Sequence, residues 1–237
     1  MILSVHLAHV GPPAVLRCLS RTPTADDSPG LRYASVTLVA ALGGPLLPLV
    51  QPGRVGLVAA WEDDAALDRF LESHPLAERM RSGWHVRLEP LRAVGEWSAL
   101  PELEQSHGRA DDGEPVAAVT LGRLRPSQGL RFFRASTPAE RAAVSHPGVV
   151  LSAGLARPPR LVATFSLWRT VAEMRDYAYG ANGAPHPAAS SAHKQRPFHS
   201  ESIFGRFRPY RSAGSWEGRD PLAAAAARPD VSVAAGG

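Results

Sequence analysis

Two stretches within residues 163–216 decide the fold, Trp168-Arg-Thr-Val-Ala-Glu-Met-Arg-Asp-Tyr177 and Arg206-Phe-Arg-Pro-Tyr-Arg-Ser-Ala-Gly-Ser-Trp216, because each repeats an earlier part of the chain. Moved back by 107 residues, the first lies on Trp61-Glu-Asp-Asp-Ala-Ala-Leu-Asp-Arg-Phe70, with Trp on Trp. Moved back by 119 residues, the second lies on Arg87-Leu-Glu-Pro-Leu-Arg-Ala-Val-Gly-Glu-Trp97, with five identities in one register. The chain is therefore predicted to be a duplication.

The second copy differs from the first by an insertion. The two shifts differ by 12 residues, so the extra segment lies between Tyr177 and Arg206. It contains His186 and His193. Because a feature present in one copy only is where a duplicated fold would build a single site, we expect the chemistry to lie there.

The pattern of apolar residues predicts the order β-α-β-β-α-β in each copy. Strands are expected over 2–10, 31–42, 54–61 and 84–91, with helices over 13–21 and 63–73. The second copy predicts strands over 116–124, 149–156, 161–167 and 203–211, a helix over 127–145 and another after Thr170. The longer helix should break at Thr137-Pro138, where Thr137 and Glu140 have the spacing of a capping box.

These elements predict an α+β fold with two tandem ferredoxin-like modules. The first spans residues 1–97, a polar linker spans 98–114, the second module spans 115–220, and an alanine-rich disordered tail is expected over 221–237. Each module leaves one face of its sheet bare. The two sheets should therefore cover one another and form an α+β barrel of the dimeric type within one chain.

Composition favours a soluble globular protein. The formal charge of +4 comes almost wholly from scattered arginines, with Lys194 the only lysine, so no nucleic-acid partner is expected. The single cysteine, Cys18, excludes an internal disulfide and a cysteine-based metal cage. The N-terminus does not resemble a signal peptide, and no apolar run is long enough to cross a membrane. A cytoplasmic location is therefore expected.

Residues of the second copy resemble the spheroidene monooxygenase family, which are haem-dependent oxygenases of carotenoid ketolation. The resemblance rests on Ala163-Thr-Phe-Ser-Leu-Trp168, Tyr177-Ala-Tyr179, His186, Phe198 and residues 201–209. As in the family, a histidine follows the end of the Tyr-Ala-Tyr helix and precedes the run from Glu201. The chain departs from the pattern at His199, where an aromatic residue is usual, and at Ser202, which replaces a second acid.

The resemblance implies a haem cofactor, a large apolar carotenoid-like substrate and electrons from a ferredoxin-type donor. His186 is the first choice for the axial ligand, with His193 and His199 as alternatives, and Glu201 is the candidate catalytic acid. Residues expected to line the haem or substrate pocket, or to bind propionates, are Phe165, Tyr177, Phe198, Phe204, Arg206 and Arg208. The same aromatic residues could instead be plain core, and Arg206 could form a structural ion pair, because Arg87 recurs at its position in the first copy.

Two other functions remain open from the sequence. A cofactor-free oxygenase of the same barrel type could act on a polycyclic phenol or polyketide, without haem. A barrel that binds an apolar ligand or haem without turnover would have the same fold, because fold alone does not choose a function. A homodimer and a peripheral contact with a membrane also remain open.

Overall fold

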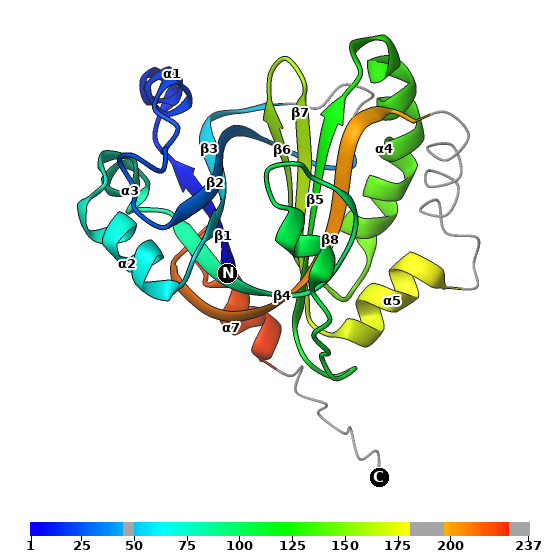
Figure 1. Cartoon of the computed structure of the whole chain (residues 1–237). Coiled ribbons are helices and arrows are strands. Elements are labelled where there is room, and N and C mark those ends of the chain that lie inside the picture. Colours follow the sequence, from blue (N-terminus) through cyan, green and yellow to red (C-terminus); the bar gives the residue numbers. More distant parts are fainter. Residues whose placement is uncertain (45–49, 181–196, 228–237) are drawn as a thin grey trace.

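The computed structural model describes residues 1–44, 50–180 and 197–227, and its eight strands close into one barrel (Figure 1). The strand order is β1-β3-β2-β6-β7-β5-β8-β4, and every neighbouring pair is antiparallel. The strands are β1 (Ile2–His9), β2 (Leu31–Ala40), β3 (Val50–Trp61), β4 (Trp84–Glu96), β5 (Val116–Leu124), β6 (Val149–Arg157), β7 (Leu161–Trp168) and β8 (His199–Gly214).

The barrel consists of two half-sheets with the same order, β4-β1-β3-β2 and β8-β5-β7-β6, which confirms the predicted α+β barrel of tandem ferredoxin-like modules. The half-sheets join where β2 pairs with β6 and β4 pairs with β8. Along β4 and β8 the repeated arginines pair crosswise, Arg87 with Arg211 and Arg92 with Arg206. The two copies therefore lie side by side and run in opposite directions.

Helices cover the outside of the barrel, and alternate strand residues fill its interior. Helices α1 (Pro12–Ser20), α2 (Asp64–Ser73) and α3 (Pro75–Met80) pack on the first half-sheet, while α4 (Gly129–Ser145) and α5 (Val171–Tyr179) pack on the second (Figure 1). Asp63 caps α2 and Thr170 caps α5 through their side chains, at the two places where the sequence predicted that a helix begins. None of the helices in the described ranges is long and apolar enough to cross a bilayer.

Helix α4 does not break at Pro138, contrary to the prediction. It runs unbroken from Gly129 to Ser145 with Pro138 inside it. The Thr137 hydroxyl donates to the Phe133 carbonyl at 2.7 Å instead of capping a new helix. Ala139 and Ala143 beyond the proline are buried. We attribute the continuous helix to this packing, which outweighs the hydrogen bond that Pro138 cannot donate.

Segments predicted as linker and tail contribute to the core. Leu100 and Leu103 are buried with Trp97 in the core of the barrel, and η1 (Pro101–Gln105) follows Leu100. Residues three apart lie above one another on a 3₁₀ turn, a spacing too short to stand out in the sequence. In the predicted tail, α7 (Pro221–Ala226) is an ordered helix with Ala225 buried, because Asp220 caps it and accepts a hydrogen bond from Trp84 Nε1 at 2.9 Å. Residues 228–237 lie outside the described part.

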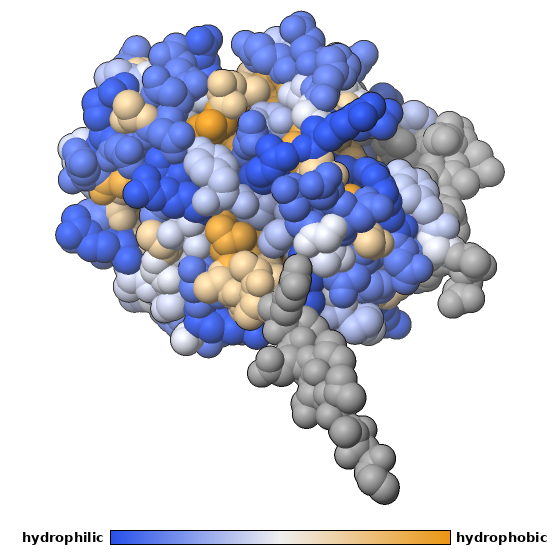
Figure 2. Space-filling model, turned by 90° about the horizontal axis from the view of Figure 1, so that it is seen from below, coloured by the Kyte–Doolittle hydropathy of each residue, from blue (hydrophilic) through white to orange (hydrophobic). Residues whose placement is uncertain are grey.

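Seen from below, the surface is mostly hydrophilic, with a small hydrophobic area near its centre (Figure 2).

Strands β4 and β8 are longer than predicted, because β4 extends to Glu96 and β8 begins at His199. They gain this length because they pair with each other almost from end to end. The first residue of β8 follows closely on the insertion, and the early start of this strand positions the site described next.

Candidate active site

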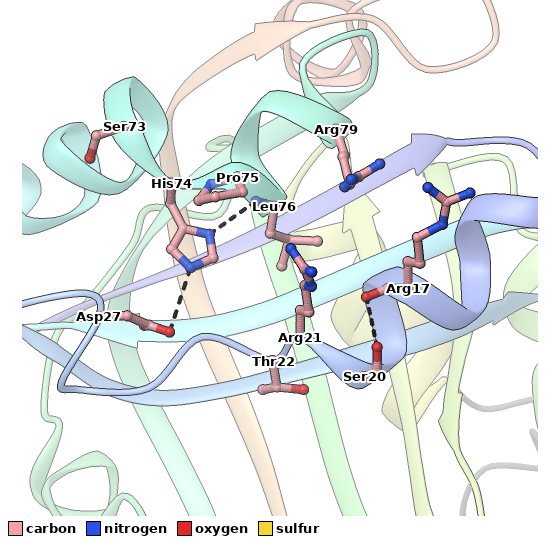
Figure 3. Close-up of a pocket in the computed structure, with 10 residues that line it drawn as sticks. All are labelled: Arg17, Ser20, Arg21, Thr22, Asp27, Ser73, His74, Pro75, Leu76 and Arg79. Atoms are coloured by element: carbon pink, nitrogen blue, oxygen red, sulfur yellow. Dashed lines mark hydrogen bonds and ion pairs between the residues drawn. The ribbon is translucent and has the colours of Figure 1, made fainter.

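The structure has a cleft on the outside of each half of the barrel. The one in the first half is polar and lies between the end of α1 and the α2–α3 junction (Figure 3). The one in the second half is apolar and lies between α4 and the outer face of β5, β6 and β7. Phe132 and Phe133 of α4 form one wall, and His199 and Glu140 are its titratable residues. The apolar cleft has the character of a small-molecule site, which is usually concave with few polar groups.

Small side chains create the apolar cleft. Trp61 and Trp168 end equivalent strands, so Leu57 and Thr164, four residues earlier in each, are equivalent. Their strand partners are Val36 in the first half and Gly154 in the second. Val36 and Leu57 are fully buried under helices in the first half. The second half therefore has Thr and Gly where the first has large aliphatic residues, and this leaves space beneath α4.

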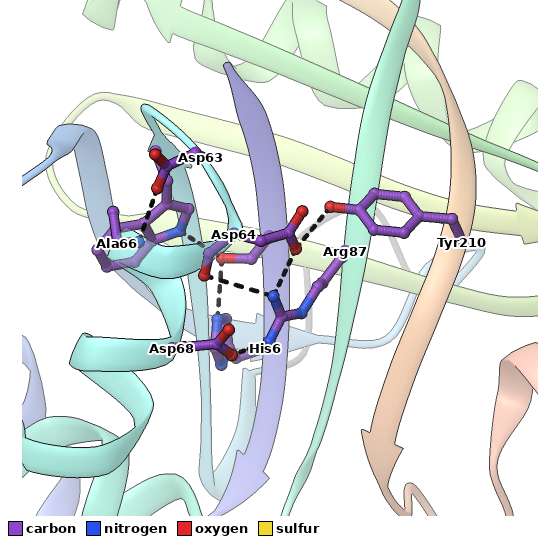
Figure 4. Close-up of polar contacts among 9 residues, drawn as sticks. His6, Asp63, Asp64, Ala66, Asp68, Arg87 and Tyr210 are labelled. Carbon is purple, nitrogen blue, oxygen red and sulfur yellow. Dashed lines mark hydrogen bonds and ion pairs between the residues drawn. The ribbon is translucent and has the colours of Figure 1, made fainter.

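A polar network joins α2 to β4 in the first half of the barrel. Arg87, only 3% exposed, reaches from β4 to the carboxylates of Asp64 and Asp68 on α2 (Figure 4). The Tyr210 hydroxyl donates to Asp64 Oδ1 at 2.9 Å. Burial by itself raises the pKa of Asp64, but the hydrogen bonds from Arg87 and Tyr210 outweigh it and hold that pKa below its usual value. The network therefore fastens α2 to the barrel.

The imidazole of His199 occupies the floor of the apolar cleft. A Cβ at Gly122 would meet His199 Cδ2 and Nε2 at 2.7 Å, so the ring lies directly against the backbone of β5. The Phe132 ring meets it edge to face, with centroids 5.0 Å apart. The His199 carbonyl accepts from Arg125 Nε at 3.0 Å, which fixes the start of β8. His199, which stands where an aromatic residue is usual in the family, therefore places an imidazole in the cleft.

Phe198 directly precedes His199, the first residue of β8. Its ring is buried, 5.7 Å from that of Phe132, and the Arg131 guanidinium lies over it at 4.6 Å. The structure thus brings two of the predicted residues, Phe198 and His199, together with an aromatic helix face. Phe165 is not among them, because it points into the barrel interior, where its ring is 6.1 Å from that of Trp84.

Tyr177 and Phe204 belong to the core under α5. The Tyr177 ring stacks on Trp168 with centroids 5.1 Å apart, and its hydroxyl donates to the Ala139 carbonyl at 3.0 Å. Phe204 packs against the same apolar cluster. Burial, with a smaller effect of the Glu140 charge, raises the pKa of Tyr177 to about 12. Tyr177 is thus a neutral phenol that ties α5 to α4.

Ionisation of Tyr177 is expected to weaken the fold at high pH. Because its folded-state pKa is about 12 and that of a free tyrosine is about 10, its contribution is complete below pH 10 and is lost as pH rises toward 12. Urea titrations at pH 9 and pH 11 should show a fall in the free energy of unfolding that is smaller in Tyr177→Phe. An equal fall in both proteins would contradict this assignment.

Three predicted polar residues have partners elsewhere. Arg206 Nη2 donates to the Tyr179 hydroxyl at 3.1 Å, and Arg208 pairs with Glu89 at 2.7 Å. Glu201 accepts from Ser98 Oγ at 3.2 Å and lies 3.6 Å from Arg123. None of Glu201, Arg206 and Arg208 lines the apolar cleft. His186 and His193 lie outside the described residues.

Sequence reasoning missed much of the cleft wall. Its strand residues Thr120, Gly122 and Gly154, and its helix residues Phe132 and Phe133, were not predicted. A glycine inside a strand marks a close approach of another group, and two such glycines in the second copy were the available signal. The second available signal was the pair of adjacent phenylalanines, Phe132 and Phe133, on one helix.

Comparison with known proteins gives the following likenesses. No family model matches the chain. Proteins named spheroidene monooxygenase are similar to it: that of Rubrivivax gelatinosus is 35% identical over 228 residues, covering 92% of this chain and 86% of the relative. That of Rhodobacter capsulatus is 28% identical over 173 residues, covering 70% of this chain and 71% of the relative. A solved aldoxime dehydratase in complex with butyraldoxime has a TM-score of 0.50 and 9% identity, over 88% of this chain and 79% of that one, and shows the fold alone.

Proposed function

This chain belongs to the spheroidene monooxygenase family, and from that premise we propose that it is a haem-dependent monooxygenase whose reaction takes place in the cleft beneath α4. The observation that carries the proposal is the imidazole of His199 lying on Gly122 in an apolar space, where the first half has the buried side chains of Val36 and Leu57. The lining supports a large apolar, carotenoid-like substrate, because few polar groups are present to bind anything else.

The residue types that line the cleft are ones that could hold a haem. An imidazole is the commonest axial ligand of haem iron, and His199 supplies one among the described residues. Gly122 and Gly154 remove side chains from the sheet, so that a flat group can approach the backbone. The cleft measures about 100 Å³, whereas sites for drug-sized ligands span roughly 300–1,000 Å³. As it stands the cleft is smaller than such a site, so the proposal includes a movement of α4 away from the sheet. Pro138 gives that helix a point where one backbone hydrogen bond cannot form.

A bound haem would supply the iron at which dioxygen is activated. Around it, His199 would hold the metal, while Phe132 and Phe133 would exclude water and orient the polyene. A ferredoxin-type donor would deliver two electrons, so that one oxygen atom enters a C–H bond of the substrate and the other leaves as water with two protons. The chain's own contribution is thus to bind, to orient and to keep the reacting carbon dry.

The visible absorption spectrum of the protein titrated with haem tests this proposal. We expect the wild type and the exposed-histidine control His9→Ala to show the same Soret band, and His199→Ala to lose or shift it. The variants His186→Ala and His193→Ala are measured in parallel. A band that depends on either of them and not on His199 would move the ligand to the insertion.

Turnover separates the remaining alternatives. Product formation by haem-free protein would favour a cofactor-free oxygenase. Bound haem that converts no carotenoid, even with reduced ferredoxin, would indicate a binding protein without this activity. The proposal requires both the band and the product.

A further inference from the structure

The polar cleft in the first half of the barrel is larger than the apolar one. It measures about 470 Å³ and lies between the C-terminal end of α1, the segment that follows it and the α2–α3 junction. That volume is in the range of small-molecule sites. No part of the proposed monooxygenase reaction uses it, because it lies on the other half-sheet from the cleft beneath α4.

Three guanidinium groups converge in this cleft. Arg17 and Arg21 extend from the end of α1 toward α3, from which Arg79 extends (Figure 3). Within the described part of the chain, none of the three side chains forms an ion pair or a hydrogen bond. The cleft has a single described carboxylate, Asp27, and this faces His74 at 3.8 Å.

Two other arginines near the cleft differ from these three because each has an acidic partner. Arg32 pairs with Glu62, and Arg81 pairs with Glu78. Like charges that share a partly enclosed space repel one another, and the repulsion is relieved when an anion binds between them. Arg17 and Arg79 also lie in the last turns of their helices, where a cation interacts favourably with the helix dipole. Arg21 is the C-cap residue of α1, so the same dipole favours it, and its side chain turns into the space that the other two share.

We propose that this cleft binds a ligand bearing phosphate groups. A guanidinium presents two parallel N–H donors that match phosphate oxygens, and several arginines together match a diphosphate better than a single carboxylate. The cleft extends past the arginines to Leu76 and Pro75, so there is room for an organic group attached to the phosphate. The phosphate could belong to a free diphosphate compound or to a lipid headgroup, and the experiment below separates these sources.

Isothermal titration of the full chain with inorganic pyrophosphate tests the site. We expect binding that weakens roughly tenfold to a hundredfold in Arg17→Ala, Arg21→Ala or Arg79→Ala, because each removes charged hydrogen bonds. The matched control is Arg81→Ala, which removes the same charge from the same region and should change the affinity by less than about twofold, since surface ion pairs contribute little. Arg21→Lys keeps the charge but loses the two parallel N–H donors of the guanidinium, so its affinity for pyrophosphate should lie between those of the wild type and Arg21→Ala.

Sedimentation with vesicles identifies the source of the phosphate. A lipid headgroup requires that the protein sediment with phosphatidylcholine vesicles only when they contain phosphatidate, and that the three alanine variants not do so. A soluble diphosphate ligand requires pyrophosphate binding without such sedimentation. The proposal is overturned if neither occurs, or if Arg81→Ala weakens binding as much as the cleft variants. Melting curves without ligand are recorded for every variant, so that a purely structural role appears as lost stability with unchanged affinity.

Discussion

Replacing both Asp64 and Asp68 with alanine is expected to lower the free energy of unfolding by about 3–5 kcal/mol. The reason is the burial of their partner: the Arg87 side chain is only 4% exposed, so the double variant leaves a guanidinium inside the protein without a counter-charge. Urea denaturation at neutral pH, followed by circular dichroism, measures the effect. The variant also removes the acceptor of the Tyr210 hydroxyl, so the contact between β8 and α2 is lost as well.

Removing the cation should be less damaging than removing the anions. Arg87→Met leaves two carboxylates that are about half exposed and can be hydrated, and its side chain partly fills the space. The control Glu62→Ala breaks an exposed ion pair with Arg32 and should cost less than about 1 kcal/mol. A double variant that is no less stable than Glu62→Ala would contradict the assignment.

The same network predicts how stability depends on acid. Because the pKa of Asp64 is held below its usual value, its contribution is complete above the ordinary aspartate pKa of about 3.9 and is lost as pH falls further. The wild type should therefore lose more stability between pH 5 and pH 3 than the double variant does.

Substituting Gly122 with alanine is expected to lower kcat/KM for a carotenoid substrate by about a hundredfold while the protein stays folded. The added Cβ would lie 2.7 Å from the ring of His199, so the imidazole must leave its present position. The backbone itself tolerates the change, since Ala8 stands at the equivalent position of β1. Steady-state turnover and the visible spectrum are measured together.

A glycine in open space provides the control for that variant. No atom lies within 4 Å of a Cβ built at Gly113, so Gly113→Ala should keep wild-type turnover and melting temperature. Full activity in Gly122→Ala would show that His199 does not need its place against β5. Loss of folding in that variant would point to packing and not to the site.

The duplication made most of the fold predictable from the sequence. The repeat of Trp61 at Trp168 and of Arg87 at Arg206 fixed the two modules, and the caps at Asp63 and Thr170 fixed helix starts. Errors arose where tertiary packing overrides a local signal. Pro138 sits inside α4 because the buried alanines that follow it hold the helix against the sheet, and η1 is too short for a recognisable period.

The site was only partly predictable because it depends on which face of a strand a residue occupies. Phe165 is one residue from Thr164, yet Thr164 lines the apolar cleft while Phe165 fills the barrel interior. Such alternation follows from strand geometry, but assigning the faces requires knowing what covers each. The sequence marked His199 as a departure from the family pattern and as an alternative axial ligand, but ranked it behind His186. The importance of His199 came from Gly122 on another strand, a contact that no sequence spacing reveals.

Rescue of His199→Gly by free imidazole tests the central claim most directly, namely that this side chain serves the reaction from the cleft beneath α4. We predict that the haem-loaded variant loses both the wild-type Soret band and carotenoid oxidation, and that added imidazole restores both, while His9→Gly needs none. A variant that keeps the wild-type spectrum and turnover without imidazole would contradict the claim.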